Sequence, residues 1–220
     1  MAEIETLTVD EPLGERIERH NFDRLLMLSD GVFAIAITLL ALELRPPEHW
    51  QGGLDALATA MWRPLFAYSA GFVIIGAFWL VHRRLFAKLR RVDAAATSLS
   101  LLLLFLIALV PAVASLISDY GPTRTMLLYL LTVAAISTVH LALWAYSALI
   151  ANLADPSLDR PARLNQTLQM AVPALAFSIL CGAGLWGVDV TKPLPLLLTL
   201  LPIAVTRRWL SWRNKPSVTA

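Results

Sequence analysis

Six long apolar segments are the feature of this sequence that most restricts its fold. Each approaches the roughly 20 residues that an α-helix needs to cross a bilayer, and they lie at 25–44, 64–82, 97–117, 125–150, 168–188 and 193–210. A segment in hydrocarbon must satisfy its own backbone hydrogen bonds, so the segments are predicted to be helices. Because 57% of the residues are hydrophobic and only 15% are charged, we predict an all-α membrane protein with six transmembrane helices.

The distribution of basic residues predicts the orientation of these helices. Of the 18 Lys and Arg residues, 14 lie in the N-terminal segment, the second and fourth connections and the C-terminal segment. The positive-inside rule then places both termini in the cytoplasm. The predicted organisation is a cytoplasmic segment at 1–23, a six-helix transmembrane domain at 24–212 and a cytoplasmic tail at 213–220.

The composition of the sequence and the motifs that it lacks exclude several classes of function. The formal net charge of +2 is too balanced to predict binding to nucleic acid. A single cysteine, Cys181, excludes a disulfide framework and a cysteine-based zinc site. There is no Thr-Val-Gly-Tyr-Gly potassium filter, no phosphate-binding glycine loop and no nucleophile elbow. We therefore expect no enzyme and no cofactor, and we look for function in the helices themselves.

The first apolar segment differs from the others because it carries Asp30 about one turn inside the span. An ionisable side chain in a membrane is costly and commonly marks a functional site that faces protein or water. An ordinary alternative is that Asp30 lies at the headgroup boundary, where it accepts hydrogen bonds near a helix N-terminus together with Ser29. Position alone leaves both interpretations open.

Helical geometry assigns Asp30 and the apolar residues of this segment to different faces. Successive residues of an α-helix are rotated by about 100° around its axis. Five residues therefore lie within roughly 60° of Ile35 around the helix, and together with Ile35 they form one stripe: Leu28, Gly31, Ile35, Thr38, Leu39 and Leu42. Asp30 lies about 140° away. If the Ile35 stripe faces a central axis, Asp30 points back toward a cationic or hydrogen-bonding partner on a neighbouring helix. Contact with lipid or plain helix packing explains such a stripe equally well.

Three further side chains in the spans are candidates for a polar network. Trp79 and His82 are three residues apart on the second segment and share a helix face. His82 is placed to pair with Asp30, although an interfacial cluster that serves only topology is the ordinary explanation. His140 lies midway along the fourth segment, where we expect a neutral imidazole bonded to a carbonyl or a hydroxyl.

The motif around Asp30 closely resembles the signature of the transmembrane protein 175 family, which comprises potassium channels that lack the usual filter. The family pattern is Arg-x-x-x-Phe-Ser-Asp, and the chain has Arg24, Leu28, Ser29 and Asp30 at these positions. The departure at Leu28 keeps the apolar bulk but loses an aromatic ring. The second segment, with Trp79, His82 and the following Arg-Arg-Leu-Phe, and the third, which ends at Pro111, also look like the family.

This resemblance implies a fold, a function and a set of site residues. The six-span size is similar to that of prokaryotic members, which assemble as homotetramers in the cell (inner) membrane. The first helix of each subunit would line the pore, potassium would be the permeant ion, and selectivity would be modest. The residues at the matching apolar constriction are Ile35, Leu39 and Leu42, with Thr38 at a hydroxyl position. The residues that would join the first two helices are Arg24, Ser29, Asp30, Trp79 and His82.

A proton- or cation-coupled secondary transporter is the competing hypothesis. It would use Asp30, His82 and His140 as groups that carry protons. Such a transporter predicts saturable, pH-driven flux that Asp30→Asn abolishes, whereas a channel predicts unitary currents.

Overall fold

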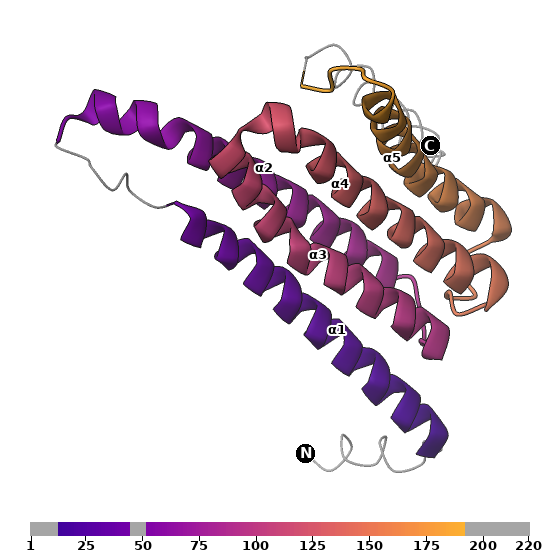
Figure 1. Ribbon diagram of the computed structural model, residues 1–220. Helices are drawn as coiled ribbons and strands as arrows, with labels where there is room; N and C mark the ends of the chain where they lie inside the picture. Colours follow the sequence, from indigo (N-terminus) through magenta and orange to yellow (C-terminus); the bar gives the residue numbers. More distant parts are fainter. Residues whose placement is uncertain (1–12, 45–51, 192–220) are drawn as a thin grey trace, which may run out of the picture.

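The computed structural model is an elongated bundle of helices (Figure 1), and it describes residues 13–44 and 52–191. The described elements are α1 (Leu13–Leu40) with a 3-10 turn (Ala41–Glu43), α2 (Leu54–Phe86), α3 (Ala94–Tyr120), α4 (Pro122–Ala145) with a π-helical segment (Tyr146–Ile150), and α5 (Arg160–Leu185). Successive helices run in opposite directions along the bundle (Figure 1). The prediction of an all-helical fold is confirmed for these residues.

Four helices are long and apolar enough to cross a membrane: α2, α3, α4 together with its π-helical segment, and α5. The first predicted span is also a helix, but the 18 residues that end at Leu40 include Asp23, Arg24 and Asp30. These three charged residues distinguish α1 from the four more apolar helices. The predicted sixth span, 193–210, lies outside the described residues, and so does the predicted tail at 213–220.

α3 and α5 begin earlier than their apolar segments do, and a polar residue caps the start of each. Asp93 Oδ1 accepts a hydrogen bond of 2.8 Å from the Ala96 amide at the start of α3. Asp159 Oδ1 accepts one of 2.9 Å from the Ala162 amide at the start of α5. Such caps satisfy amides that have no partner inside the helix. Hydropathy alone placed these two helix starts at 97 and 168, which is too late.

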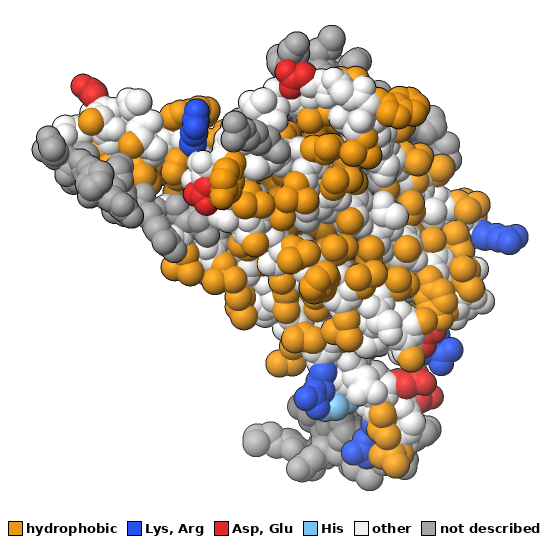
Figure 2. Space-filling view, in the orientation of Figure 1, with side chains coloured by type: hydrophobic (Ala, Val, Ile, Leu, Met, Phe, Trp, Pro, Cys, Tyr) orange, Lys and Arg blue, Asp and Glu red, His pale blue; other side chains and the backbone are white. Residues whose placement is uncertain are grey.

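The loops after α2 and α4 meet at one end of the bundle. The Arg90 amide donates to the Leu153 carbonyl at 3.0 Å, and the Asp155 amide donates to the Lys88 carbonyl at 2.9 Å. Seven basic residues of α2, α5 and these loops therefore gather at this end: Arg83, Arg84, Lys88, Arg90, Arg91, Arg160 and Arg163. This clustering is what the positive-inside rule requires of the cytoplasmic side. On the face that Figure 2 shows, hydrophobic side chains cover most of the bundle between its ends.

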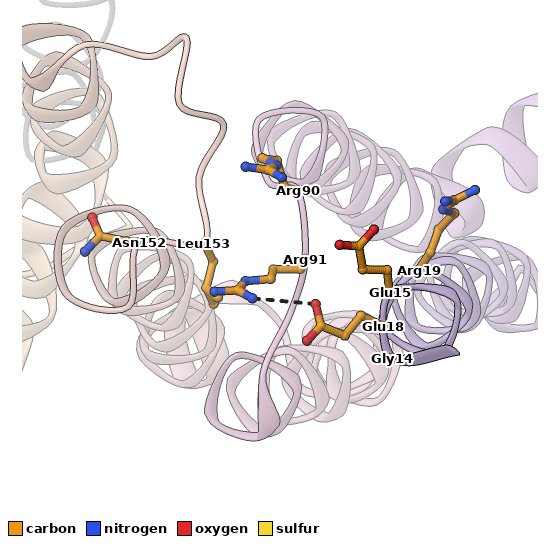
Figure 3. Close-up of a pocket in the computed structure, with 8 residues that line it drawn as sticks. All are labelled: Gly14, Glu15, Glu18, Arg19, Arg90, Arg91, Asn152 and Leu153. Carbon is orange, nitrogen blue, oxygen red and sulfur yellow. Dashed lines mark ion pairs between the residues drawn. The ribbon is translucent and has the colours of Figure 1, made fainter. Parts of the chain in front are cut away.

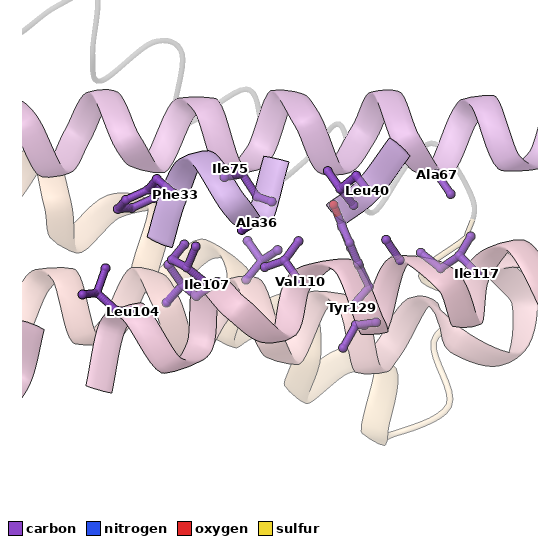
Figure 4. Close-up of a cluster of buried hydrophobic side chains, with 14 of the residues drawn as sticks. Phe33, Ala36, Leu40, Ala67, Ile75, Leu104, Ile107, Val110, Ile117 and Tyr129 are labelled. Atoms are coloured by element: carbon purple, nitrogen blue, oxygen red, sulfur yellow. The ribbon is translucent and has the colours of Figure 1, made fainter. Parts of the chain in front are cut away.

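α1 packs against both α2 and α3 through one side of its helix. Phe33, Ala36 and Leu40 of α1 are buried there, against Ile75 of α2 and Ile107 of α3 (Figure 4). A second buried cluster near the basic end is centred on Trp144, whose indole Nε1 donates to the Thr167 hydroxyl at 3.1 Å. The two clusters fix α1 on the bundle and α4 against α5.

Gly71 of α2 permits the close approach of α1, and its replacement gives a first prediction. A Cβ at this position would lie 2.9 Å from Cδ2 of Leu40, which is fully buried. We expect Gly71→Ala to lower the unfolding temperature of the purified protein, because Leu40 must shift within a packed core. Gly76→Ala is the matched control: a Cβ there meets no described atom within 4 Å, so helix propensity should leave stability equal or raised by about 0.5 kcal/mol. Equal effects of the two substitutions would contradict the packing.

Candidate functional site

α1 has an exposed apolar stripe on the side away from the bundle. Exposed fractions are 59% for Ile35, 42% for Leu39 and 63% for Leu42. Thr38 is exposed between them, and its Oγ1 donates a hydrogen bond of 2.9 Å to the Ile35 carbonyl. Because the hydroxyl hydrogen is used by the helix, the oxygen lone pairs of Thr38 stay available as acceptors.

The opposite side of α1 is buried, so the helix has two distinct faces. The buried residues follow each other at helical spacing and are Leu25, Ser29, Phe33, Ala36 and Leu40. α1 lies along one edge of the bundle and contacts both α2 and α3 (Figure 1). Ile35, Thr38 and Leu39 are therefore exposed on the side where lipid, water or another copy of the chain can reach them.

Asp30 joins α1 to α2. Its Oδ1 accepts a hydrogen bond of 2.8 Å from the Trp79 indole Nε1. The Arg83 guanidinium lies 4.9 Å from the centre of the same indole ring, in the range of a cation–π contact. The acidic side chain is thus held at the side of α1 that meets α2, away from the Ile35 stripe.

The other residues of the predicted network occupy different places. Ser29 is buried and donates to its own helix, at 2.8 Å from the Leu25 carbonyl. Arg24 is exposed. His82 is fully buried in α2 between the rings of Phe33 and Phe86, and no hydrogen bond joins it to Asp30.

His82 and His140 meet inside the bundle, which the sequence did not reveal. Their ring centres are 5.7 Å apart, edge to face, and His140 stacks on Phe78 at 5.5 Å. Neither imidazole makes a hydrogen bond of standard geometry to a described residue. His140 does interact with the backbone of Ile136, although outside standard hydrogen-bond geometry, so the expectation that it bonds a carbonyl stays a prediction. One histidine in each of two apolar helices was the available signal, but only the register of α2 against α4 brings them together.

A polar pocket of about 590 Å³ lies at the basic end of the bundle (Figure 3). It is formed by the start of α1 and the loops after α2 and α4. Arg91 Nη1 lies 3.6 Å from Glu18 Oε2 across it, and it also contains Glu15, Arg19 and Arg90. Acidic and basic side chains offset one another here, so the pocket ties α1 to the loops and has no marked preference for ions of one sign.

Comparison with known proteins identifies the family of the chain. Residues 24–111 match the family model described as the endosomal/lysosomal potassium channel TMEM175. A potassium channel of Streptomyces collinus is 33% identical over 178 residues, which cover 78% of this chain and 86% of that protein. The chain belongs to the TMEM175 family. The resemblance inferred from the Asp30 motif is thereby confirmed.

Other family members agree with this assignment. A potassium channel of Chamaesiphon minutus is 33% identical over 153 residues, which cover 66% of this chain and 75% of that protein. A crystal structure of a TMEM175 homologue from the same organism, described as a lysosomal potassium-selective channel homologue, superposes with a TM-score of 0.68. It is 26% identical, and the match covers 90% of this chain and all of that one.

Family membership also settles two broader predictions. The family consists of ion channels, so the chain is not an enzyme. Bacterial relatives and four membrane-spanning helices identify a multi-pass membrane protein of a prokaryote. The human relative, described as the endosomal/lysosomal proton channel TMEM175, is 30% identical over 102 residues, which cover only 20% of that protein.

Proposed function

We propose that this protein is a potassium-selective channel whose pore is lined by α1 of four identical subunits. One α1 cannot enclose a pore, and Ile35 and Leu39 are exposed on the side of α1 away from the bundle. Selectivity is modest, and both chain termini face the cytoplasm. The constriction residues are Ile35, Leu39 and Leu42, with Thr38 beside them. The bacterial relatives are potassium channels, which supports potassium as the permeant ion.

The division of α1 into two faces carries this proposal. The buried face holds α1 on α2 and α3, and the Asp30–Trp79 hydrogen bond keeps the acidic group away from the stripe. The face of α1 that would line the pore of the proposed tetramer is therefore apolar, except for the hydroxyl of Thr38. The same contacts support a pore without a ring of charged side chains.

An apolar constriction explains both gating and selectivity. A narrow ring of Ile35 side chains excludes water and blocks ions, and slight widening lets water and ions enter. Sodium holds its water more tightly than potassium does, so dehydration in the neck costs sodium more. Thr38 lies at the helical turn next to Ile35, and its oxygen replaces part of the lost hydration. Because no cage of carbonyl groups replaces the whole shell, the expected preference for potassium is modest.

The buried contact between His82 and His140 favours the second candidate, a proton- or cation-coupled transporter. Two imidazoles 5.7 Å apart on neighbouring helices resemble the beginning of a proton pathway. Asp30 would be the third group of such a pathway. The two hypotheses differ in the consequence of removing the charge of Asp30.

Flux into liposomes that contain the purified protein separates the two functions. We expect potassium flux down its gradient at constant pH, slower sodium flux, and unitary currents in planar bilayers. Asp30→Asn keeps an oxygen that accepts from Trp79, so we expect the current per open channel to change by less than about twofold. Asp30→Ala removes the acceptor and should lower the amount of assembled protein.

A different pattern would refute the channel. Saturable flux that requires a pH gradient and disappears in Asp30→Asn would establish the transporter instead. Trp79→Phe is the matched control for Asp30→Ala, because it removes the hydrogen bond between Asp30 and Trp79 without removing any charge. A proton pathway should survive this change if the protein still folds.

A further inference from the structure

An open groove lies between the end of α2 and the first half of α5, separate from the Ile35 stripe. Its volume is about 580 Å³. From α2 and the loop that follows it come Val81, Arg84, Ala87 and Lys88, and from α5 come Gln166, Gln169, Met170 and Pro173. Among these described lining residues there are two cations and no carboxylate. In this respect the groove differs from the polar pocket of Figure 3, where glutamates offset the arginines.

Lys88 is held in the groove by two contacts. Its Nζ donates a hydrogen bond of 2.5 Å to Gln166 Oε1 and lies 5.7 Å from the centre of the Trp144 ring. Burial, and then repulsion from Arg84, lower the pKa of Lys88 below its ordinary value. A bound anion would favour the charged form of Lys88 and offset this repulsion. The side chain is therefore held close to a second cation, where a bound anion would be stabilised.

The lining residues change from polar to apolar along the bundle. Arg84 and Lys88 are nearer to the basic end than Val81 is, because α2 runs toward that end. On α5, which runs the other way, Gln166 precedes Met170 and Pro173 in the direction of the apolar middle. The two cations and Gln166 thus lie toward the basic end, Gln169 and Met170 lie at about the same level farther along α5, and Pro173 lies nearest to the apolar middle. This is the polarity of an amphiphile.

We propose that the groove binds one anionic phospholipid. The lipid phosphate lies against Arg84 and Lys88, and the Gln169 amide hydrogen-bonds to glycerol or ester oxygens. The upper part of an acyl chain contacts Val81, Met170 and Pro173. Basic pockets between transmembrane helices bind anionic headgroups in this manner. The orientation proposed above assigns the lipid to the cytoplasmic leaflet, but the headgroup contacts do not depend on that assignment.

Lipid retention by the full-length protein tests this site. The protein is equilibrated in nanodiscs of equal parts phosphatidylglycerol and phosphatidylcholine, re-purified in mild detergent, and its bound lipids are counted by native mass spectrometry. We expect the wild type to retain phosphatidylglycerol in preference to phosphatidylcholine. In Arg84→Gln/Lys88→Gln, this preference should fall by about 20-fold, because two cations near the phosphate are lost.

A matched control separates the groove from general surface charge. Arg90→Gln/Arg160→Gln removes the same charge at the same end of the bundle, from exposed residues outside the groove, and it should retain phosphatidylglycerol as the wild type does. Gln169→Glu places a carboxylate in the groove at nearly constant size, and it should also lose the preference. Gln169→Glu tests the groove if the protein with the double substitution Arg84→Gln/Lys88→Gln fails to fold.

Three results would overturn the proposal. The first is a wild type that retains both lipids equally. The second is an equal loss in Arg90→Gln/Arg160→Gln, which would indicate a diffuse surface effect. The third is full displacement of phosphatidylglycerol by millimolar inorganic phosphate, which would indicate a site for a soluble anion.

Discussion

Replacement of Ile35 by asparagine is expected to raise the potassium current through the reconstituted protein about tenfold and to weaken its preference over sodium. A polar ring wets more easily than an apolar ring, so the neck conducts more of the time. A barrier lower by about 1.4 kcal/mol corresponds to the tenfold change. Because sodium then pays less for dehydration, its permeability should rise more than that of potassium. Single-channel recording with potassium on one side and sodium on the other measures both quantities.

The control for Ile35 is an equally exposed residue on another helix. Ile179 of α5 is 69% exposed, so Ile179→Asn makes the same chemical change away from the proposed axis. We expect its conductance and selectivity to equal those of the wild type. Ile35→Val should also be close to the wild type, because it stays apolar. Unchanged conductance and selectivity in Ile35→Asn would remove Ile35 from the gate.

Replacement of Arg163 by alanine is expected to cause a loss of stability that is large for a partly exposed residue. Its guanidinium donates to the carbonyls of Leu158 and Ala148 at 3.0 Å each and to that of Asp155 at 3.3 Å. These bonds tie the end of the π-helical segment and the following loop to α5. Hydrogen bonds from a charged group contribute more than neutral ones, and partial exposure reduces their sum to about 2–3 kcal/mol.

Thermal unfolding measures this loss. We expect Arg163→Ala to lower the unfolding temperature by about 6–10 °C. Arg163→Lys keeps the positive charge that favours the cytoplasmic side but cannot make three divergent hydrogen bonds, so most of the loss should remain. Arg160→Ala removes an exposed arginine three residues earlier and should change the temperature by less than about 2 °C. An unfolding temperature of Arg163→Lys equal to that of the wild type would mean that charge alone matters.

Much of the helical arrangement could be predicted because apolar length is a direct physical requirement of the membrane. The ends of the helices could not be read from hydropathy. α1 begins at Leu13, well before the apolar segment that starts at Leu25, and Glu18 in this polar part pairs with Arg91. The Asp93 and Asp159 caps were visible in the sequence, and they would have corrected the starts of α3 and α5.

The sequence predicted the direction in which Asp30 points, but it did not predict which residue Asp30 contacts. Helical geometry predicted that Asp30 points away from the Ile35 stripe toward a neighbouring helix, and the Trp79 indole is what it meets there. The choice between Trp79 and His82 depends on the rotation of α2, which the sequence does not give. The contact of His82 with His140, and the groove around Lys88, likewise depend on how distant segments of the chain are aligned.

Block by cadmium at position 35 tests most directly whether the α1 stripes surround the conducting axis. In a chain without Cys181 (Cys181→Ala), Ile35→Cys introduces one thiol per subunit, and a ring of thiolates at the neck binds a soft cation such as Cd²⁺. We predict that micromolar Cd²⁺ stops the potassium current and that a chelator restores it, whereas Ile179→Cys in the same background is unaffected. Current through Ile35→Cys that persists in Cd²⁺ would place this stripe in lipid and contradict the account.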